Sequence, residues 1–546
     1  MPSVRRGRAA AAESPPPSSP LPARHATTAV AAVAVALPAA TEAQVERSVR
    51  AALDAVRFPL TRLVRSVAAR LTTQPRAVGL ATLEVEVREA VQVLGRELLT
   101  ELLRLRGTGS RGHSYVCPCG VRLVLKEVAP LQQRTWFGTI TLERAVYAGA
   151  GCTLRAHHVP LDAEWDVLGL TPPTDALPDP DGGVLPAAPP GPGPARLAPA
   201  FAAVVGEFGA QLPYAAAATL LERACGAVAH LSPTTVGAST KAAGQARAHL
   251  EDTLRVRTTP PSRAERRAVL DRPVPPPPAT APDTLVISMD GAIERTDDGW
   301  KEVKLGAVYD LVTRLRHTKG LDTVVRLPGA TTYTATLAAA QDFARQVVAT
   351  AQRRGLGWAR QVAVLGDGAK WIWKLADRRF PGAVQIVDWF HAHEHLWTLA
   401  QLLYGEGTTT AWAWLETLAG ELWAAQTADE VALIATAAEE AWATPRKDLP
   451  DDAPRRTKAR HREVTKAVAY FTANAGRLRY GAFRAQDLPV GSGVVEGGCQ
   501  SVLHTRLKRP GACWSAAGAE AMVRARALLC SDPISASSHP YDRLAC

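Results

Sequence analysis

The sequence has little cysteine for its length and lacks any long hydrophobic run. Its 546 residues include 8 Cys at irregular spacings, which excludes a disulfide framework as the basis of the fold. No apolar run approaches the roughly 20 residues that a membrane-spanning helix needs, so we expect no membrane partner. Lysine is also scarce, at 11 of the 63 basic residues. A GC-rich genome favours arginine, so the number of basic residues is weak evidence of a polyanionic partner. Their positions in the sequence are stronger evidence.

The composition is otherwise that of a folded, basic protein. Hydrophobic residues make up 47% of the chain, and its length is enough for roughly three or four domains. The formal net charge of +11 points toward a polyanionic partner. Arg5 and Arg6 precede an alanine-valine run at 29–40, as in an export signal, but a Pro/Ser-rich stretch separates the two parts. We interpret this region as a disordered leader.

Shifts in composition and periodicity predict ten segments. They are a disordered leader (1–40), an N-terminal helical region (41–112), a small Cys-bearing β-rich module (113–170), a Pro/Gly linker (171–196), a helical region (197–270), a second linker (271–283), the first part of an α/β core (284–404), a helical insertion (405–488), a C-terminal part of the core (489–530) and a tail (531–546). Ser232 and Pro233 fit a helix start in the segment 197–270. That segment reads either as a helix-turn-helix that binds DNA or as an ordinary helical hairpin.

Within the first part of the core, strand and helix patterns alternate. We predict strands at 284–290, 300–312, 361–367 and 383–389, and helices at 334–355, 369–380 and 393–403. Such alternation is typical of an α/β fold.

Three acidic residues are the candidate catalytic groups. Asp290 and Asp367 each end the apolar run of a predicted strand, and Glu496 opens a predicted helix in a glycine-rich, basic context. Each aspartate precedes glycine, so taken alone it could simply cap a turn. Together, three carboxylates on separate elements could hold two Mg²⁺ or Mn²⁺ ions for phosphoryl transfer.

The sequence around Glu496 favours a nucleic-acid substrate. Between residues 446 and 510 there are 14 Arg and Lys against 6 Asp and Glu, a local net charge of +8 (14 − 6). Glu496, Gln500, His504 and Lys508 recur at four-residue spacing, which puts them on one side of a helix. The candidate DNA contacts are Arg506, Lys508, Arg509 and Trp514. A solvated basic face is the alternative.

Three passages carry a family resemblance: MDGAIERTDDGWKEVKLGAVYD, GDGAKWIWKLADRRFPGAVQIVDWFHAHEHL and GSGVVEGGCQSVLHTRLKRPGACWS. They resemble the signature blocks of bacterial insertion-sequence transposases of the Kra group. The resemblance implies an RNase H-like catalytic core with a helical insertion and an acidic triad of Asp290, Asp367 and Glu496. It also implies Mg²⁺ as the metal, terminal-inverted-repeat DNA as the substrate, and a homo-oligomer at the nucleoid in the cytoplasm.

Two functions other than transposition stay open. The chain could be a transposase-derived protein that binds DNA without cutting it. It could also be a host nuclease of the same fold, which would cleave DNA without end specificity or strand joining.

Asp388 and His391 follow the second predicted aspartate and are candidate accessory residues. Their D-x-x-H spacing resembles an element of related transposases, and a structural hydrogen-bonded pair is the equal alternative. His391, Glu394 and His395 also match H-x-x-E-H, a zinc-hydrolase motif. The surrounding core-like pattern argues against that interpretation.

Cys117, Cys119 and Cys152 resemble a zinc ribbon that has lost part of its ligand set. The first pair is C-x-C instead of C-x-x-C, and Gly149 stands where another Cys would be expected. His157 or His158 could complete a set of three Cys and one His. We favour a metal-free ribbon and keep zinc as the alternative.

Overall fold

The computed structural model describes most of the chain between residues 42 and 532. The described ranges are 42–73, 79–117, 119–152, 157–164, 197–225, 231–258, 282–318, 321–444 and 457–532. The predicted leader and first linker lie outside these ranges, as do nearly all residues of the second linker and the tail. The chain divides after Ala51 into two compact units, and the second, Ala52–Cys546, contains both sheets and all the helices after α1.

Two long helices begin the described part of the chain. They are α1 (Glu42–Thr73), whose first ten residues belong to the first unit, and α2 (Leu80–Arg106). Arg70 of α1 and Glu86 of α2 form a paired hydrogen-bonded contact that joins the helices. The helical periodicity predicted for this region is confirmed.

A small antiparallel sheet follows, with the strand order β1-β2-β3. Its strands are β1 (Ser114–Val116), β2 (Arg122–Thr135) and β3 (Gly138–Ala148), followed by the short helix α3 (Pro160–Glu164). Alternate residues are buried in the first half of β3, from Gly138 to Leu142, whereas Ala145, Val146 and Tyr147 near its end are all buried. Leu99 and Leu103 of α2 pack against Ile140 and Leu142 of the sheet, and Leu161 of α3 joins them.

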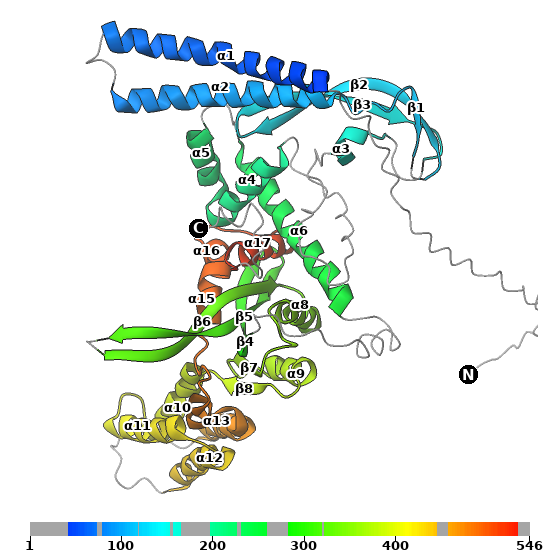
Figure 1. Ribbon diagram of the computed structural model, residues 1–546. Helices are drawn as coiled ribbons and strands as arrows, with labels where there is room; N and C mark the ends of the chain where they lie inside the picture. The colour runs from blue at the N-terminus through cyan, green and yellow to red at the C-terminus, as the bar shows by residue number, and fades with distance from the viewer. Residues whose placement is uncertain are drawn as a thin grey trace, which may run out of the picture. The chain divides into compact units, whose positions relative to one another are not determined.

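The next region is helical and contacts the C-terminal part of the chain. Its helices are α4 (Pro199–Gln211), α5 (Tyr214–Cys225) and α6 (Pro233–Thr258). The hydroxyl of Ser232 accepts a hydrogen bond from the backbone N–H of Thr235 at 3.1 Å, so the predicted helix start is confirmed. α6 packs closely against α17 (Ala516–Leu529), because a Cβ at Gly244 would overlap the carbonyl oxygen of Ala521 (Figure 1).

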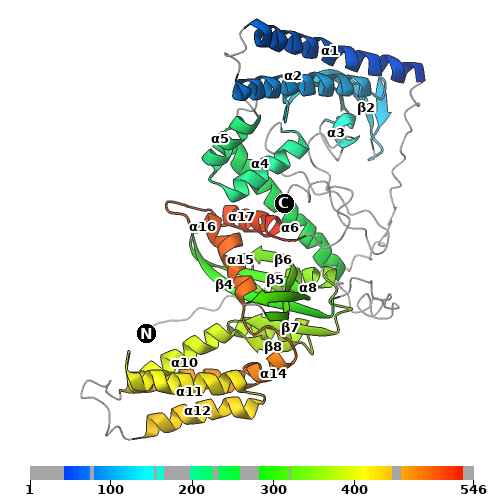
Figure 2. The ribbon, with the colours of Figure 1, turned by 60° about the vertical axis from the view of Figure 1, so that its left-hand side comes forward.

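A five-stranded mixed sheet forms the centre of the chain, in the order β6-β5-β4-β7-β8 (Figure 2). Its strands are β4 (Thr284–Thr296), β5 (Gly299–Thr318), β6 (Leu321–Thr336), β7 (Gln361–Gly366) and β8 (Val384–Val387). β5 runs antiparallel to β4 and β6, whereas β7 is parallel to both β4 and β8. The protein is therefore of the mixed α/β class, with two sheets.

Helices follow β6, β7 and β8 of this sheet in turn. They are α8 (Ala340–Arg353), α9 (Lys370–Arg379) and α10 (Trp389–Tyr404). The sequence did not predict β6, and the predicted helix start at Thr334 is wrong, because Thr334 lies in β6. There its backbone pairs with Gly306 of β5, so the tertiary pairing overrides the local helical pattern.

The segment 405–488 contains helices and no strand among its described residues, as predicted. They are α11 (Thr409–Ala424), α12 (Ala428–Ala443), α13 (Lys458–Asn474), the 3₁₀ turn η1 (Ala475–Arg477) and α14 (Tyr480–Ala485). Their apolar side chains join those of the central sheet in one hydrophobic core. None of the helices in the described ranges is both long and apolar enough to span a bilayer.

A broken helix follows the insertion and crosses β4 and β5. It consists of α15 (Gly493–Gly498), the π-helical turn η2 (Cys499–His504) and α16 (Thr505–Leu507). The helix predicted to begin near Glu496 is confirmed, but a π-turn interrupts it. Gly498 allows this close crossing, because a Cβ there would lie 2.5 Å from the ring of Tyr333.

Candidate functional site

The parallel pairing of β4 and β7 places Asp290 and Asp367 next to each other. Met289 pairs with Gly366 as the last parallel pair, and each aspartate follows directly. β7 ends at that point, as predicted. The predicted end of β4 at Asp290 is wrong, because antiparallel pairing with β5 carries the strand on to Thr296.

Asp290 is partly buried, and its two carboxylate oxygens have different partners. Oδ1 accepts a hydrogen bond from the backbone N–H of Gly291 at 2.7 Å. Oδ2 accepts one from the thiol of Cys499 at 3.3 Å. Burial raises the pKa of Asp290, and the negative charge of Asp367 raises it further, while His391 acts in the opposite direction. A bound cation would remove this unfavourable electrostatic energy.

Asp367 lies in the tight loop between β7 and α9. Its Oδ1 accepts a hydrogen bond from the backbone N–H of Ala369 at 2.9 Å, and Gly368 has φ of +100°. A Cβ at Gly368 would lie 2.9 Å from the ring of Tyr470, which belongs to α13. The Tyr470 ring stacks on His395 at 3.8 Å. The helical insertion therefore reaches the loop that holds Asp367.

The hydroxyl of Tyr470 is a buried polar group beside the acidic residues. It has no hydrogen-bond partner among the described residues. Burial raises the pKa of Tyr470 above its usual range, and the charges of Asp367 and Asp388 raise it further. The hydroxyl thus stays protonated at neutral pH and is available as a donor at this edge of the sheet.

Asp388 belongs to a second acidic group, with His391 and Glu496, and forms the hydrogen bonds that hold it together. Its side chain is fully buried, caps α10 by accepting from the backbone N–H of His391 at 3.0 Å, and also accepts from the backbone N–H of Ser492. The Ser492 hydroxyl donates to Glu496 at 2.5 Å. Side-chain atoms of Asp388, His391 and Glu496 all lie within 4.8 Å of one another and could hold a metal ion.

The two acidic groups adjoin each other. Cys499 contacts Asp290 and follows Glu496 by three residues in the same broken helix. The backbone N–H of Asp388 in the second group donates a hydrogen bond at 2.9 Å to the carbonyl oxygen of Gly366, the residue before Asp367. The five candidate catalytic and accessory residues therefore lie along one edge of the central sheet, but of the five only Asp388, His391 and Glu496 form a group of possible metal ligands in the described ranges. Oxygen ligands at a partly buried site suit a hard divalent cation.

The zinc-hydrolase motif is not assembled in the structure. His391 Nδ1 lies 3.7 Å from Glu394 Oε2, and His391 groups with Asp388 and Glu496 instead of with His395. His395 stacks on Tyr470. No group of possible metal ligands in the described ranges contains both histidines of the motif.

The predicted DNA contacts divide into surface and buried residues. Lys508 and Arg509 are exposed. Arg506 is only 4% exposed, lies over the rings of Tyr214 and Trp514, and donates a hydrogen bond to the carbonyl oxygen of Gly209 at 3.2 Å. The prediction that Arg506 contacts DNA is therefore wrong, because its guanidinium joins the broken helix to α4. Trp514 is partly buried in the same contact.

A hollow of about 560 Å³ lies along the predicted polar row. Its lining residues are Gly497, Gln500, Ser501, His504, Thr505 and Lys508. Beneath them Glu294 of β4 is buried, with its Oε1 3.4 Å from His504 Nε2 and 3.9 Å from Lys508 Nζ. Burial raises the pKa of Glu294 and lowers that of His504. The hollow therefore presents polar and basic groups beside the acidic edge.

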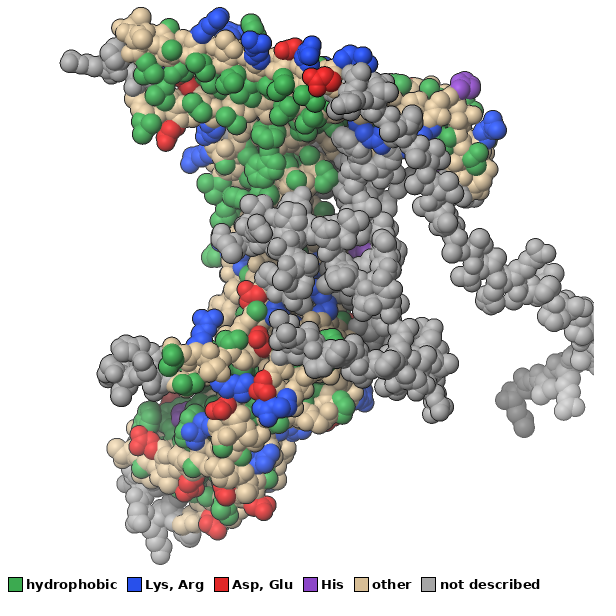
Figure 3. Space-filling model, in the orientation of Figure 1, with side chains coloured by type: hydrophobic (Ala, Val, Ile, Leu, Met, Phe, Trp, Pro, Cys, Tyr) green, Lys and Arg blue, Asp and Glu red, His purple; other side chains and the backbone are tan. Residues whose placement is uncertain are grey.

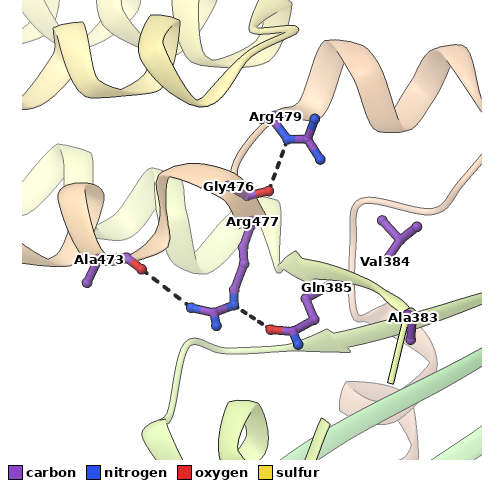
Figure 4. Close-up of a pocket in the computed structure, with 8 residues that line it drawn as sticks. Ala383, Val384, Gln385, Ala473, Gly476, Arg477 and Arg479 are labelled. Atoms are coloured by element: carbon purple, nitrogen blue, oxygen red, sulfur yellow. Dashed lines mark hydrogen bonds between the residues drawn. The ribbon is translucent and has the colours of Figure 1, made fainter. Parts of the chain in front are cut away.

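A second hollow, of about 510 Å³, lies where η1 meets the edge strand β8 (Figure 4). Arg477 Nε donates to Gln385 at 2.7 Å, and Arg479 Nε donates to the carbonyl oxygen of Gly476 at 3.1 Å. Because both guanidinium groups bond to neighbouring residues, we assign this hollow a structural role.

The three predicted cysteines gather with a histidine. The Cys152 sulfur lies 3.8 Å from that of Cys117, 3.6 Å from that of Cys119 and 3.0 Å from Nε2 of His158. His158 Nε2 is also 3.8 Å from the Cys117 sulfur. Burial raises the pKa of the Cys117 thiol to about 11. Cys117, Cys119 and Cys152 are placed so that they could hold a metal ion.

Sequence patterns did not reveal several residues of the candidate site. Glu294 lies on β4, Tyr470 on α13, and Ser492 and Cys499 lie close to Glu496 in the sequence, so only the fold brings the three regions together. Glu294, Ser492 and Cys499 lie in passages that resemble the family blocks, and that position could have drawn attention to them, whereas Tyr470 carries no such signal. No protein-family model and no curated protein matches the chain.

Proposed function

We propose that the protein is a DDE transposase that cleaves DNA at the terminal inverted repeats of an insertion sequence and joins it to a new site. One observation carries the proposal: acidic residues from four separate segments meet at one edge of the mixed sheet. The five-stranded order with an antiparallel hairpin on one side and parallel strands on the other supports the expected RNase H-like core. The helical insertion before Glu496 agrees with the family resemblance.

Asp290, Asp367 and Glu496 would hold the metal ions in this mechanism, with Mg²⁺ or Mn²⁺ as the ion. When bound, such ions activate the attacking oxygen and stabilise the leaving oxygen in phosphoryl transfer. Asp388 is a positioning residue, because both its oxygens already accept backbone hydrogen bonds that fix Ser492 and α10. Ser492 in turn orients Glu496. His391 is exposed enough to contact DNA or to accept a proton.

The DNA would pass over the polar hollow beside this edge. Lys508 and Arg509 supply exposed positive charge that can neutralise phosphates, so DNA binding should weaken as salt rises. Because a transposase must bring two DNA ends together, the proposal implies a homo-oligomer. Because its substrate is the bacterial chromosome, it also implies a location at the nucleoid in the cytoplasm.

The test uses the DNA that flanks the gene on both sides as substrate. With Mg²⁺, a transposase will cut at the boundary of the repeats and join the released 3′ ends to a second duplex. A nuclease will cut both flanking and unrelated DNA without joining. A DNA-binding relic will retard the flanking DNA in a gel and leave it intact under both Mg²⁺ and Mn²⁺. Either of the last two results would overturn the proposal.

For the cysteine module we propose a structural zinc ion held by Cys117, Cys119, Cys152 and His158. Tetrahedral zinc with Zn–S distances of about 2.3 Å requires sulfur separations of about 3.8 Å, close to the observed 3.6 and 3.8 Å. The sequence alone favoured a metal-free ribbon. The fold changes that preference, because the β-bridge between His158 and Tyr147 holds His158 beside the cysteines, where it would be the fourth ligand.

Zinc content tests this assignment. We expect about one zinc ion per chain by elemental analysis of purified protein, and its loss in Cys152→Ser, with earlier melting of the small sheet. Cys513→Ser is the matched control, because Cys513 is exposed and outside the cluster. Protein from zinc-supplemented cells that contains no zinc would contradict the assignment.

A further inference from the structure

The hairpin of α1 and α2 carries a row of exposed apolar side chains on each helix. The row consists of Leu53, Leu60, Val64 and Leu71 on α1 and of Leu80, Val87, Val91, Leu98, Leu102 and Leu105 on α2, whereas the exposed Phe58, Val85 and Val93 lie on other sides of the helices. At 3.6 residues per turn, the four on α1 point within about 20° of one direction and the six on α2 within about 40°. Figure 3 shows apolar side chains gathered over both helices on one face.

This row remains after the hairpin has made its contacts within the chain. Arg70 and Glu86 join the two helices, and Leu99 and Leu103 pack against the small sheet. Even so, α2 has no buried residue, and Leu53 and Leu80 are 61% and 74% exposed. Apolar residues that recur at intervals of four and seven are typical of a helix face that packs in a bundle. Exposed apolar surface of this extent marks an interaction site.

We propose that this row is a dimerisation surface, on which the α1–α2 hairpins of two copies of the chain form a four-helix bundle. A two-fold axis parallel to the helices turns the same face of both copies inward, so that α1 of one copy packs against α2 of the other. The interface is then self-complementary, with an apolar row opposite an apolar row.

The charges of the two helices favour this pairing. α1 contains six Arg and three acidic residues, a net charge of +3 (6 − 3), whereas α2 contains four Arg and five Glu, a net charge of −1 (4 − 5). Pairing α1 with α2 of the other copy brings opposite charges together and keeps the two basic helices diagonal to each other. Pairing α1 with α1 would place like charges side by side.

The first test measures the molar mass of the full chain by light scattering, without DNA or added metal. We expect a dimer, at about twice the chain mass of 58.1 kDa. The variant Val64→Glu with Leu98→Glu should raise the dissociation constant at least about 100-fold, because each glutamate would be buried without a partner. Ser66→Glu with Thr82→Glu is the matched control, since both positions are exposed on other sides of the same helices. Circular dichroism checks that helix content is retained.

The second test identifies the helices that meet. Arg70 and Glu86 contact each other, so they lie at the same height along the two antiparallel helices. Counting along both helices from this pair places Val64 at about the same height as Val91. The variant Val64→Cys with Val91→Cys should give a disulfide-linked dimer on mild oxidation, with the 64–91 link found by peptide mass spectrometry. The single variant Val64→Cys should not.

Three results would overturn the inference. They are a monomer at micromolar concentration, a dimer that survives the glutamate substitutions, and glutamate variants that lose DNA binding while the molar mass is unchanged. The last result would assign the row to DNA instead of a second copy. The inference supplies a surface for the oligomer in the proposed function, but neither test involves DNA cleavage, so each proposal can fail without the other.

Discussion

Replacing Asp367 by Asn should reduce cleavage and joining of the flanking DNA at least about 1,000-fold, and so should Asp290→Asn and Glu496→Gln. Each substitution keeps the shape of the side chain and removes a negative charge that would hold a cation, and one cation accounts for several kcal/mol of transition-state stabilisation. DNA binding, measured by fluorescence anisotropy, should change little, because the basic surface is intact. The matched control is Glu406→Gln, at an exposed acid in a loop of the helical insertion.

Asp290→Asn should also stabilise the metal-free protein at neutral pH. Burial raises the pKa of Asp290 in the folded state above its unfolded value. Between these two pKa values the native state binds more protons than the unfolded state, so stability falls as the pH rises through this window and stays low above it. Asparagine is uncharged, so it removes the free-energy cost of burying a carboxylate at this position. The melting temperature of the wild type should rise on acidification through this window relative to the variant, and Mg²⁺ should stabilise only the wild type.

These measurements separate the roles of the carboxylates. An Asp367→Asn variant that cuts DNA as fast as the wild type would refute the metal-binding role. Activity that is lost together with the folded state, seen as a broadened or absent unfolding transition, would assign Asp367 a structural role instead. The Glu406→Gln control shows whether loss of any acidic residue in this region has the same effect.

Asp388→Ala should destabilise the core by about 2–4 kcal/mol. The alanine removes the cap of α10, which is worth about 1 kcal/mol, and leaves the backbone N–H of Ser492 buried without an acceptor, which costs about 1–3 kcal/mol. The shift of the core's unfolding transition in urea measures this change. Because Ser492 orients Glu496, activity should also fall under conditions where the protein is folded.

Thr427→Ala provides the comparison, since Thr427 caps α12 at an exposed position and has no second role. It should cost only about 1 kcal/mol and leave DNA cleavage unchanged. If Asp388→Ala costs no more than Thr427→Ala, the bond to Ser492 contributes nothing, and the link from Asp388 to Glu496 is wrong. A destabilised Asp388→Ala protein with full activity would make Asp388 purely structural.

Much of the fold could be predicted because its cause is local. Strands β7 and β8 appeared as short apolar runs, and the insertion as a long stretch with helical periodicity, because burial of one face or of a whole strand leaves a pattern in consecutive residues. The acidic candidates were visible for the same reason, since Asp367 ends such a run. The helix start was placed too early because Thr334–Thr336 directly precede the helical pattern of α8, whereas their pairing with β5 makes them extended; no element was predicted for the rest of β6.

What the sequence by itself determined is the set of acidic candidate residues and most of the elements that carry them. The tertiary structure decided which of these residues meet. Asp290 adjoins Asp367 through strand register, and Asp388 reaches Glu496 through Ser492. Arg506, grouped with the DNA contacts by its sequence neighbours, is buried against Tyr214. Contacts between residues far apart in the sequence depend on the packing of whole elements, and no local pattern of residue types records that packing.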